Sequence, residues 1–542
     1  MKDETLPRAA IADAGDAGVY DGARWNSYDR VPDALGSYPQ THPDRLATVA
    51  TLLGLSPPAP QRCRVLELGC GRGGNLIPMA LTLPGAQFVG VDLAEPRVAN
   101  GRAMVSELAL KNVELRAQDI LDIDDSLGTF DYVICHGVYS WATPEVQRKI
   151  LQVCRRNLAP QGVAYVSYNT LPGSHGRGDW RAMLRYHVAR FTEPADRVRE
   201  ARALIEALGR GAGEDTARGK HLRGTARWLG GKSDAYLLHE HLGRDDEPLY
   251  FHQFAERAAA QGLQYLGEAN FETMALGPST LPGPVGEDPR EALLAVSSDL
   301  VHREQYEDFV GNRVDRQTLL CHAGEAPQRP VRPSRVARLY VASPARPASA
   351  EPDLRMSHQE QFSAGPGLTL TTGDPDLKAA MSYLWSRYPG RVKFVELLDA
   401  ARRAAGDTGR DEKESADRLA MRMLHCHAGG IVEFSLLPAP FTTEVSERPV
   451  ASPYARLLTR TERNVTTMRL EQIPLPRGLR PLLAALDGTR DRADLIALVA
   501  GPIGAKWRAA GEAGKPPPDA ARVGEVVDAL LRLVARAALL VG

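Results

Sequence analysis

The sequence predicts an α/β protein whose first domain is built on a parallel sheet covered by helices on both faces. Three observations support this fold class. Short apolar segments alternate with helical stretches of about ten to fifteen residues. A glycine-rich turn, residues 69–74, follows the first apolar segment and opens a helix. The length of 542 residues is sufficient for several domains of about 100–200 residues each.

The expected elements follow in order. Residues 45–55 are expected to form a short amphipathic helix that leads into the sheet. The first five strands are expected at residues 64–68, 87–92, 113–116, 130–135 and 162–168, and the helices between them at 75–83, 97–110 and 144–158. Residues 176–247 are rich in Arg, Ala and Glu and interrupt the alternation, which indicates a helical insertion. The alternation then resumes, with helices expected at 249–261 and 289–310 and strands at 263–268 and 316–322.

The chain is expected to divide into five parts. A proline-rich stretch interrupts regular structure and indicates a linker. Two helices, at 375–405 and 412–427, precede a strand at 431–436, an order typical of a winged-helix unit. The predicted parts are an N-terminal arm (1–45), a first domain (46–325, including the insertion), the linker (326–367), the winged-helix-like unit (368–445) and a C-terminal helical domain (454–542).

Composition and charge exclude some classes of function. Lys and Arg number 66 and Asp and Glu 67, which gives a formal net charge of −1. Nucleic acids and anionic membranes are bound through basic surfaces, so neither is an expected partner. The first ten residues contain no apolar run typical of a secretory signal, and no segment approaches the ~20 apolar residues of a membrane span. We therefore expect a cytoplasmic protein without an integral membrane span.

Cysteine usage points to the same compartment. None of the six cysteines forms a Cys-x-x-Cys pair, which indicates reduced thiols. The triplet His425-Cys426-His427 resembles a metal site only in composition, because successive helical side chains point in different directions. No metal is therefore expected.

The glycine turn carries the strongest chemical signal. Gly69, Gly71 and Gly74 satisfy the spacing of a dinucleotide-binding turn, so an NAD or FAD site is one interpretation. Glu67, at the end of the preceding strand, favours another. A carboxylate there would oppose a pyrophosphate but suits a ligand that carries an ammonium and a sulfonium group.

The sequence Glu67-Leu68-Gly69-Cys70-Gly71-Arg72-Gly73 resembles the first motif of class I S-adenosylmethionine (SAM) methyltransferases, which have a Rossmann-like core. Asp92 ends the second strand, where an acid can hold ribose hydroxyls. Asp119-Ile120 resembles the adenine clamp of the family. The resemblance implies SAM as cofactor, held by eleven residues: Tyr38, Glu67, Gly69, Cys70, Gly71, Gly73, Asp92, Leu93, Asp119, Ile120 and His136.

Five further sequence segments point to a particular group of methyltransferases. They lie at residues 38–46, 137–141, 167–173, 249–254 and 316–322. Together they resemble bacterial methyltransferases that carry a methyltransferase regulatory domain, here at 230–322, a group that includes lysine methyltransferases of outer-membrane proteins. The resemblance covers residues 20–325 and implies a protein lysine as the methyl acceptor and a homodimer. Methylation of a small metabolite, natural product or other protein side chain, and a SAM-binding scaffold without turnover, remain alternatives.

The catalytic candidates follow the fourth and fifth strands. Tyr139 and Trp141 follow the fourth strand, and Tyr168 and Asn169 end the fifth. Three aromatic rings could enclose a lysine cation and disfavour its charge once water is excluded. His136 or His42 could accept its proton. Tyr139 and Trp141 could equally pack beneath the insertion.

Overall fold

The computed structural model describes residues 35–243, 247–274, 297, 299–406, 411–509 and 520–541. Its centre is a seven-stranded sheet of order β3-β2-β1-β4-β5-β7-β6. The strands are β1 (Arg64–Leu68), β2 (Gln87–Asp92), β3 (Val113–Ala117), β4 (Phe130–Cys135), β5 (Leu158–Asn169), β6 (Leu263–Glu268) and β7 (Asp315–His322). The first five are parallel, as expected, whereas β7 runs antiparallel to both β5 and β6. The predicted α/β class is therefore confirmed.

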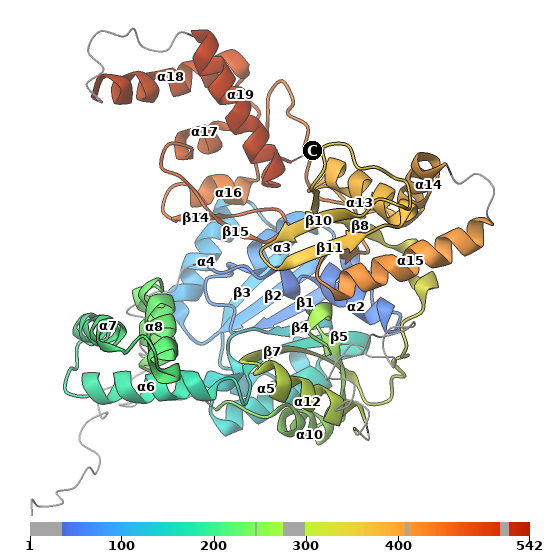
Figure 1. The fold of residues 1–542 in the computed structure, drawn as a ribbon. Coiled ribbons are helices and arrows are strands. Elements are labelled where there is room, and N and C mark those ends of the chain that lie inside the picture. The colour runs from blue at the N-terminus through green and yellow to red at the C-terminus, as the bar shows by residue number, and fades with distance from the viewer. Residues whose placement is uncertain are drawn as a thin grey trace, which may run out of the picture.

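Helices cover both faces of this sheet (Figure 1). Successive residues of a strand point to opposite faces, and β1 shows the result. Val65 belongs to the apolar cluster that also contains residues of α2 and α3, whereas Leu66 belongs to the cluster that contains residues of α5 and α10. The helices of this domain are α2 (Pro43–Leu52), α3 (Leu76–Thr82), α4 (Glu95–Glu107), α5 (Pro144–Arg156), α10 (Phe251–Ala259) and α12 (Leu300–Gly311).

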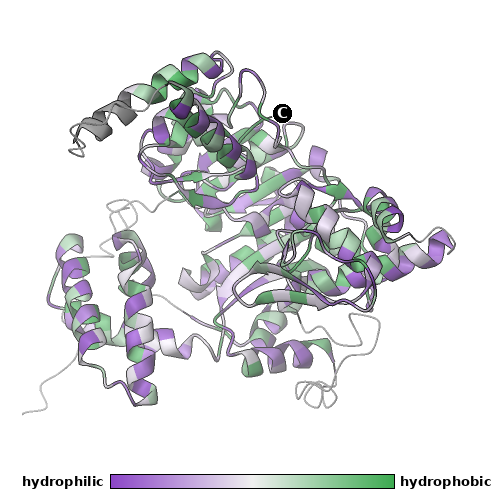
Figure 2. Cartoon of the chain, turned by 45° about the horizontal axis from the view of Figure 1, so that its top comes forward, coloured by the Kyte–Doolittle hydropathy of each residue, from purple (hydrophilic) through white to green (hydrophobic). Residues whose placement is uncertain are grey.

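The predicted helical insertion stands beside the sheet with a core of its own. It comprises α6 (His175–Val188), α7 (Pro194–Gly211), α8 (Ala217–Gly230), α9 (Asp234–Tyr236) and a π-helical turn, Leu237–His241. Trp180, Leu184 and Leu229 are fully buried within it. Figures 1 and 2 show these helices projecting from the body of the molecule, with polar residues along their outer faces.

The segment expected as a linker, residues 326–367, is instead part of a folded unit. Val331, Val336 and Phe362 have no exposed surface. Within this segment β8 (Tyr340–Ala342) lies between β12 (Val392–Lys393) and β13 (Glu433–Ser435). The segment also supplies β9 (Arg346–Pro347) and β10 (Glu360–Gly365), which pair with each other, and β10 also pairs with β11 (Leu368–Thr372). The prolines therefore separate short strands rather than whole domains.

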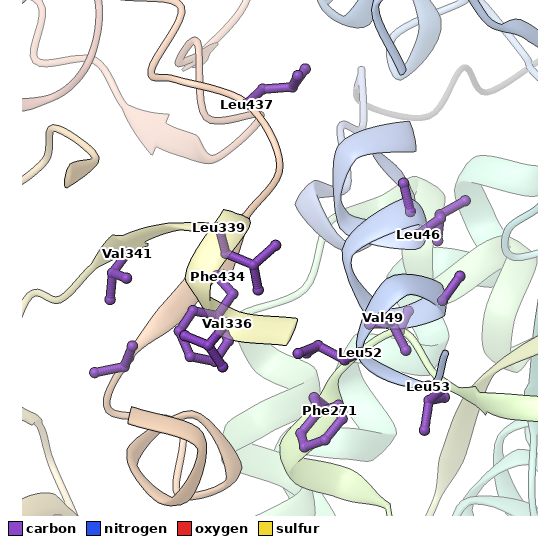
Figure 3. Packing of buried hydrophobic residues seen from close by; sticks show 14 of the residues in the cluster. Leu46, Val49, Leu52, Leu53, Phe271, Val336, Leu339, Val341, Phe434 and Leu437 are labelled. Atoms are coloured by element: carbon purple, nitrogen blue, oxygen red, sulfur yellow. The ribbon is translucent and has the colours of Figure 1, made fainter. Parts of the chain in front are cut away.

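This middle unit packs directly on the first domain. It contains α13 (Pro375–Arg387), α14 (Phe394–Ala405) and α15 (Glu412–Ala428). Figure 3 shows Leu52 of α2 and Phe271 beside Val336, Leu339 and Phe434 of the middle unit. One continuous apolar cluster therefore crosses from the sheet into the middle unit.

The last unit packs on α3 and α4 of the first domain. It comprises α16 (Pro453–Leu458), β14 (Asn464–Thr466), β15 (Gln472–Pro474), α17 (Arg480–Ala485), α18 (Arg492–Ala509) and α19 (Ala520–Arg536). Its apolar cluster includes Leu35, which precedes the first domain, and Ile77 of α3. Figure 1 shows α16 above α4. Among the described residues, no helix is both long and apolar enough to cross a membrane.

Candidate active site

The site lies at the carboxyl ends of the parallel strands, between β1 and β4. In the order 3-2-1-4-5 the direction of strand addition reverses at this pair, and α/β sheets open a ligand crevice at such a point. The loops that leave the two strands touch there. A Cβ placed on Gly69 would come within 2.4 Å of Val138 Cγ2, so only glycine fits.

The glycine turn adopts a backbone that few other residues accept. Gly71 has a φ of +53°, yet a Cβ built on it would meet no atom closer than Arg97 Nη1 at 3.9 Å. The space beside Gly71 is therefore open to a ligand, whereas the backbone itself is fixed. The Gly71 N–H donates to Asp92 Oδ2 over 2.8 Å, which ties the turn to the end of β2.

Glu67 is buried beneath this turn. Its Oε1 accepts a hydrogen bond of 2.8 Å from Asn75 Nδ2, whereas Oε2 has no hydrogen-bond partner among the described residues. Burial raises the pKa of Glu67 to about 7, although the Asn75 hydrogen bond opposes this, and Asp92 raises it further. A buried carboxyl with an unsatisfied oxygen fits a site that receives a cationic ligand, because a nearby positive charge would stabilise its ionised form.

The next two strands bring further acids to the same edge. Asp92 Oδ1 accepts from the Ala94 N–H, and Asp119 Oδ1 accepts from the Leu121 N–H. Each carboxylate is thereby fixed in direction and keeps lone pairs for ribose hydroxyls or an adenine amino group. Leu93 is 64% exposed beside Asp92, and Ile120 is half-buried beside Asp119. This arrangement of acids and apolar side chains suits a nucleoside.

An aromatic pair from two distant segments closes the other side. His136, directly after β4, has its ring centroid 3.8 Å from that of Tyr38. Its Nδ1 lies 2.8 Å from the Tyr165 hydroxyl. Burial lowers the pKa of His136 to about 4, so the ring is neutral near pH 7. The Tyr38 N–H donates to Asn75 Oδ1, which links this pair to Glu67 through one amide.

The remaining cofactor candidates support the turn. Cys70 is buried, and its N–H, like that of Gly69, donates to the Val91 carbonyl. Gly73 has a φ of +72°. Asn75, Thr41 and Tyr165 also lie at the site, although they are not among the predicted site residues. Thr41 and Asn75 hydrogen-bond to each other next to Glu67. The position of Asn75, directly after the glycine turn, is the one signal that could have identified it.

The predicted aromatic enclosure is wrong for two of its three rings. Tyr168 stacks on Phe254 of α10 at 4.0 Å, and its hydroxyl pairs with Thr318. Tyr139 is fully buried and meets the same Phe254 edge-on. Both therefore pack in the core between the sheet and α10, because α10 covers the strand ends from which they project.

The remaining catalytic candidates are Trp141, Asn169 and His42, and they have different surroundings. Trp141 is half-buried and carries the Arg181 guanidinium of the insertion over its ring, so packing beneath the insertion is its observed role. Asn169 is half-buried at the end of β5, where its N–H donates to Ser140 Oγ. His42 is wrong as a proton acceptor for the crevice, because its ring caps α2 by accepting from the Asp44 N–H and lies near Thr82.

Comparison with known families agrees with this geometry. Residues 60–189 match a methyltransferase domain and residues 233–322 a predicted methyltransferase regulatory domain. Residues 447–539 match the C-terminal winged helix domain of PKMT. This match covers the last unit, predicted as a C-terminal helical domain (454–542), and does not include residues 368–445, where the winged-helix-like unit was predicted.

The structure of PKMT2 from Rickettsia typhi, also known in complex with AdoHcy, is similar over 94% of this chain and 100% of that chain, with a TM-score of 0.82 and 30% identity. Among Rickettsia prowazekii proteins, RP789 is 44% identical over 298 residues and RP028 is 39% identical over 241 residues. The alignments cover 53% of RP789, about half of it, and 96% of RP028. The chain belongs to the family of SAM-dependent methyltransferases that combine a methyltransferase domain, a methyltransferase regulatory domain and a PKMT-type C-terminal winged helix domain.

Proposed function

We propose that this protein transfers methyl groups from SAM to lysine side chains of another protein. The observation that carries the proposal is the similarity to PKMT2 over the whole length of that chain, including the winged helix unit that docks on the methyltransferase domain. We further propose that it acts in the cytoplasm as a homodimer.

We propose that the cofactor is held by the residues that line the turn and the strand ends. Glu67 and the backbone of Gly69, Gly71 and Gly73 would face the amino-acid part, Asp92 the ribose and Asp119 with Ile120 the adenine. Leu93, with its exposed side chain, would cover the base. When bound, SAM supplies an activated methyl group for in-line displacement.

The chain's own residues must position and deprotonate the acceptor. A lysine amine with a free pKa near ~10.4 is mostly protonated near neutral pH and must lose a proton before it can attack a methyl group. His136 stands directly after β4, at the point where the crevice opens, and its ring is neutral. With Nδ1–H donating to Tyr165, Nε2 would accept that proton and pass it to water, because a ring with a pKa of about 4 does not keep a proton near neutral pH. Asn169 is proposed to hold the acceptor amine by its side-chain carbonyl.

The proposal is tested by following the methyl group. The full-length protein is incubated with methyl-labelled SAM and a bacterial protein extract, and the label is separated into macromolecular and low-mass fractions. A lysine methyltransferase places the label on protein. Label found only in low-mass products would contradict the proposal in favour of a small-molecule acceptor, and SAM binding without any label transfer would favour the scaffold alternative.

The role of His136 is tested separately with His136→Gln. This variant should retain SAM affinity, measured by isothermal titration, and lose at least tenfold in kcat. A variant that loses SAM binding in proportion to turnover would instead make His136 a cofactor contact.

A further inference from the structure

A second cavity of about 450 Å³ lies where the first domain, the middle unit and the last unit meet. It is separate from the crevice described above. The lining includes Arg45 of α2 and His42, the residue that caps this helix. Arg391 and Leu437 come from the middle unit, and Met468 from the last unit. This volume is within the range of about 300–1,000 Å³ that small-molecule sites occupy.

The walls are mainly apolar. Leu83, Ala342, Phe434, Leu437 and Met468 contribute side chains without hydrogen-bonding groups, apart from the weakly accepting methionine sulfur. A predominantly apolar lining with a few charged groups is typical of a site for an amphipathic small molecule.

The carboxylates that line the cavity are already bound by protein groups. Asp44 accepts from Arg391, from the Ser435 hydroxyl and from the Leu436 N–H. Both oxygens of Glu433 accept from Arg469 Nη2. Glu471, the third acid of the lining, accepts from Arg469 Nε, so Arg469 binds both Glu433 and Glu471. Each acid is therefore bound to a guanidinium group, and the three acids are matched in charge by Arg45, Arg391 and Arg469.

The guanidinium groups, by contrast, keep spare donors. Arg391 makes its recorded hydrogen bonds through Nη1 alone, within the part of the chain that the structure describes. Arg45 is half-buried, and its guanidinium group makes neither a hydrogen bond nor an ion pair to any described residue. The charge of Arg45 nevertheless acts on Glu433, which also lines the cavity. Burial raises the pKa of Glu433, but the guanidinium groups of Arg469 and then Arg45 lower this pKa below its ordinary value. Unused donors that face a mostly apolar space favour an anionic acceptor.

We propose that this cavity is a second ligand site, which binds an amphipathic small molecule through a carboxylate held by Arg45 and Arg391. The apolar part of the ligand packs against Leu437 and Met468. Because the ligand contacts all three units, binding stabilises the assembled chain. Binding at this site requires no methyl transfer, so this proposal does not depend on the proposal that the acceptor is lysine.

The test is isothermal titration and thermal unfolding of the full-length protein with three probes: octanoate, 4-phenylbutyrate and indole-3-acetate. Each is compared with its matching alcohol: octanol, 4-phenylbutanol and indole-3-ethanol. At least one carboxylate should bind at one site per chain, at least tenfold more tightly than its alcohol, and should raise Tm. If no carboxylate binds more tightly than its alcohol, the proposal is overturned.

Two variants and a control locate the site. Arg45→Gln removes the unpaired guanidinium without breaking a recorded hydrogen bond, and it should weaken carboxylate binding at least tenfold. Ala439→Trp, at the half-buried rim of the cavity, should block the ligand by volume. Arg62→Gln, at an exposed arginine that does not line the cavity, should leave binding unchanged. Equal binding by wild type and by both cavity variants would overturn the proposal.

Discussion

The side-chain amide of Asn75 donates a hydrogen bond of 2.8 Å to Glu67 Oε1. The same amide accepts from the Tyr38 N–H over 3.0 Å. The Asn75 side chain thus connects Glu67, beneath the glycine turn, to Tyr38, whose ring packs against His136. The two halves of the crevice are therefore positioned by a single residue.

Replacing this residue should weaken cofactor binding. Asn75→Ala removes a buried hydrogen bond to a carboxyl, and such bonds contribute about 1.5–3 kcal/mol. We expect the Kd for SAM, measured by isothermal titration, to rise at least tenfold. Asn100→Ala, at an exposed position of α4, is the control and should bind as wild type. Unchanged SAM affinity in Asn75→Ala would show that the link does not position the site.

SAM binding should depend on pH through Glu67. Burial raises the pKa of Glu67 to about 7 in the folded chain, above its ordinary value of 4.5. The folded state therefore binds this proton more tightly than the unfolded state, and the contribution of Glu67 to stability falls as pH rises from 4.5 to about 7. A cationic ligand favours the ionised form, so SAM affinity should increase as pH rises through 7.

The measurement is the Kd for SAM at a series of pH values between about 6 and 8, for wild type and for Glu67→Gln. Wild type should bind more tightly at the higher pH, and this increase should be reduced in Glu67→Gln, which cannot ionise. Parallel pH profiles for the two proteins would contradict the role given to Glu67.

The glycine turn offers a test of where the ligand lies. A side chain on Gly71 would extend into open space beside the turn, so Gly71→Arg should abolish SAM binding while the protein remains folded. Gly367 also has a positive φ, +76°, with no atom within 4 Å of an added Cβ. Gly367→Arg carries a comparable backbone strain between β10 and β11 of the middle unit and should bind SAM normally. Loss of binding in both variants would indicate a general folding defect instead.

The two buried tyrosines should matter for stability and little for chemistry. Tyr168→Ala removes a ring stacked on Phe254 and should lower the free energy of unfolding by about 3–5 kcal/mol. Tyr168→Phe keeps the ring and loses only the contact with Thr318, so it should cost about 1 kcal/mol and leave kcat within about twofold. Tyr139→Phe should likewise leave kcat within about twofold, and it should cost little stability, because the buried Tyr139 hydroxyl has no hydrogen-bond partner among the described residues. Denaturant unfolding and turnover assays compare the variants, and a large loss of kcat in a stable Tyr→Phe variant would return that residue to the catalytic group.

A buried ion cluster within the regulatory region should hold α12 on β6 and β7. Arg316 is fully buried and pairs with Glu268, Glu304 and Asp308 at 2.6–3.0 Å. Arg316→Met leaves these three acids without their shared cation, and breaking a buried pair in this way costs about 3–5 kcal/mol. Denaturant unfolding should show that loss. Stability equal to wild type would mean that the acids are compensated in another way.

The sequence predicts the sheet well because its signal is local. The bounds of β1, β2, β4 and β6 agree with the predicted segments, since each is a short apolar run next to a turn. In the middle unit, β13 lies within the strand predicted at 431–436, whereas β8 and β12 were missed because they have only three and two residues, too few for a period to be visible. The prolines around β8 instead favoured a linker.

The site shows the same division. Glycines with positive φ and acids at strand ends were predictable, because their role depends on position within one βα unit. The burial of Tyr139 and Tyr168 was not, because Phe254 covers them from a helix more than eighty residues further along the chain than Tyr168. Aromatic residues after a strand can face either a crevice or a covering helix, and only the tertiary structure decides between the two.

Methylation of protein lysine can be observed by tandem mass spectrometry of peptides. The full-length protein is first incubated with methyl-labelled SAM and a bacterial protein extract, with Gly71→Arg in parallel. We predict labelled peptides whose fragment ions place the methyl group on lysine Nζ, and no such peptides with Gly71→Arg. Methyl groups located on other side chains, or label confined to small molecules, would contradict lysine methylation.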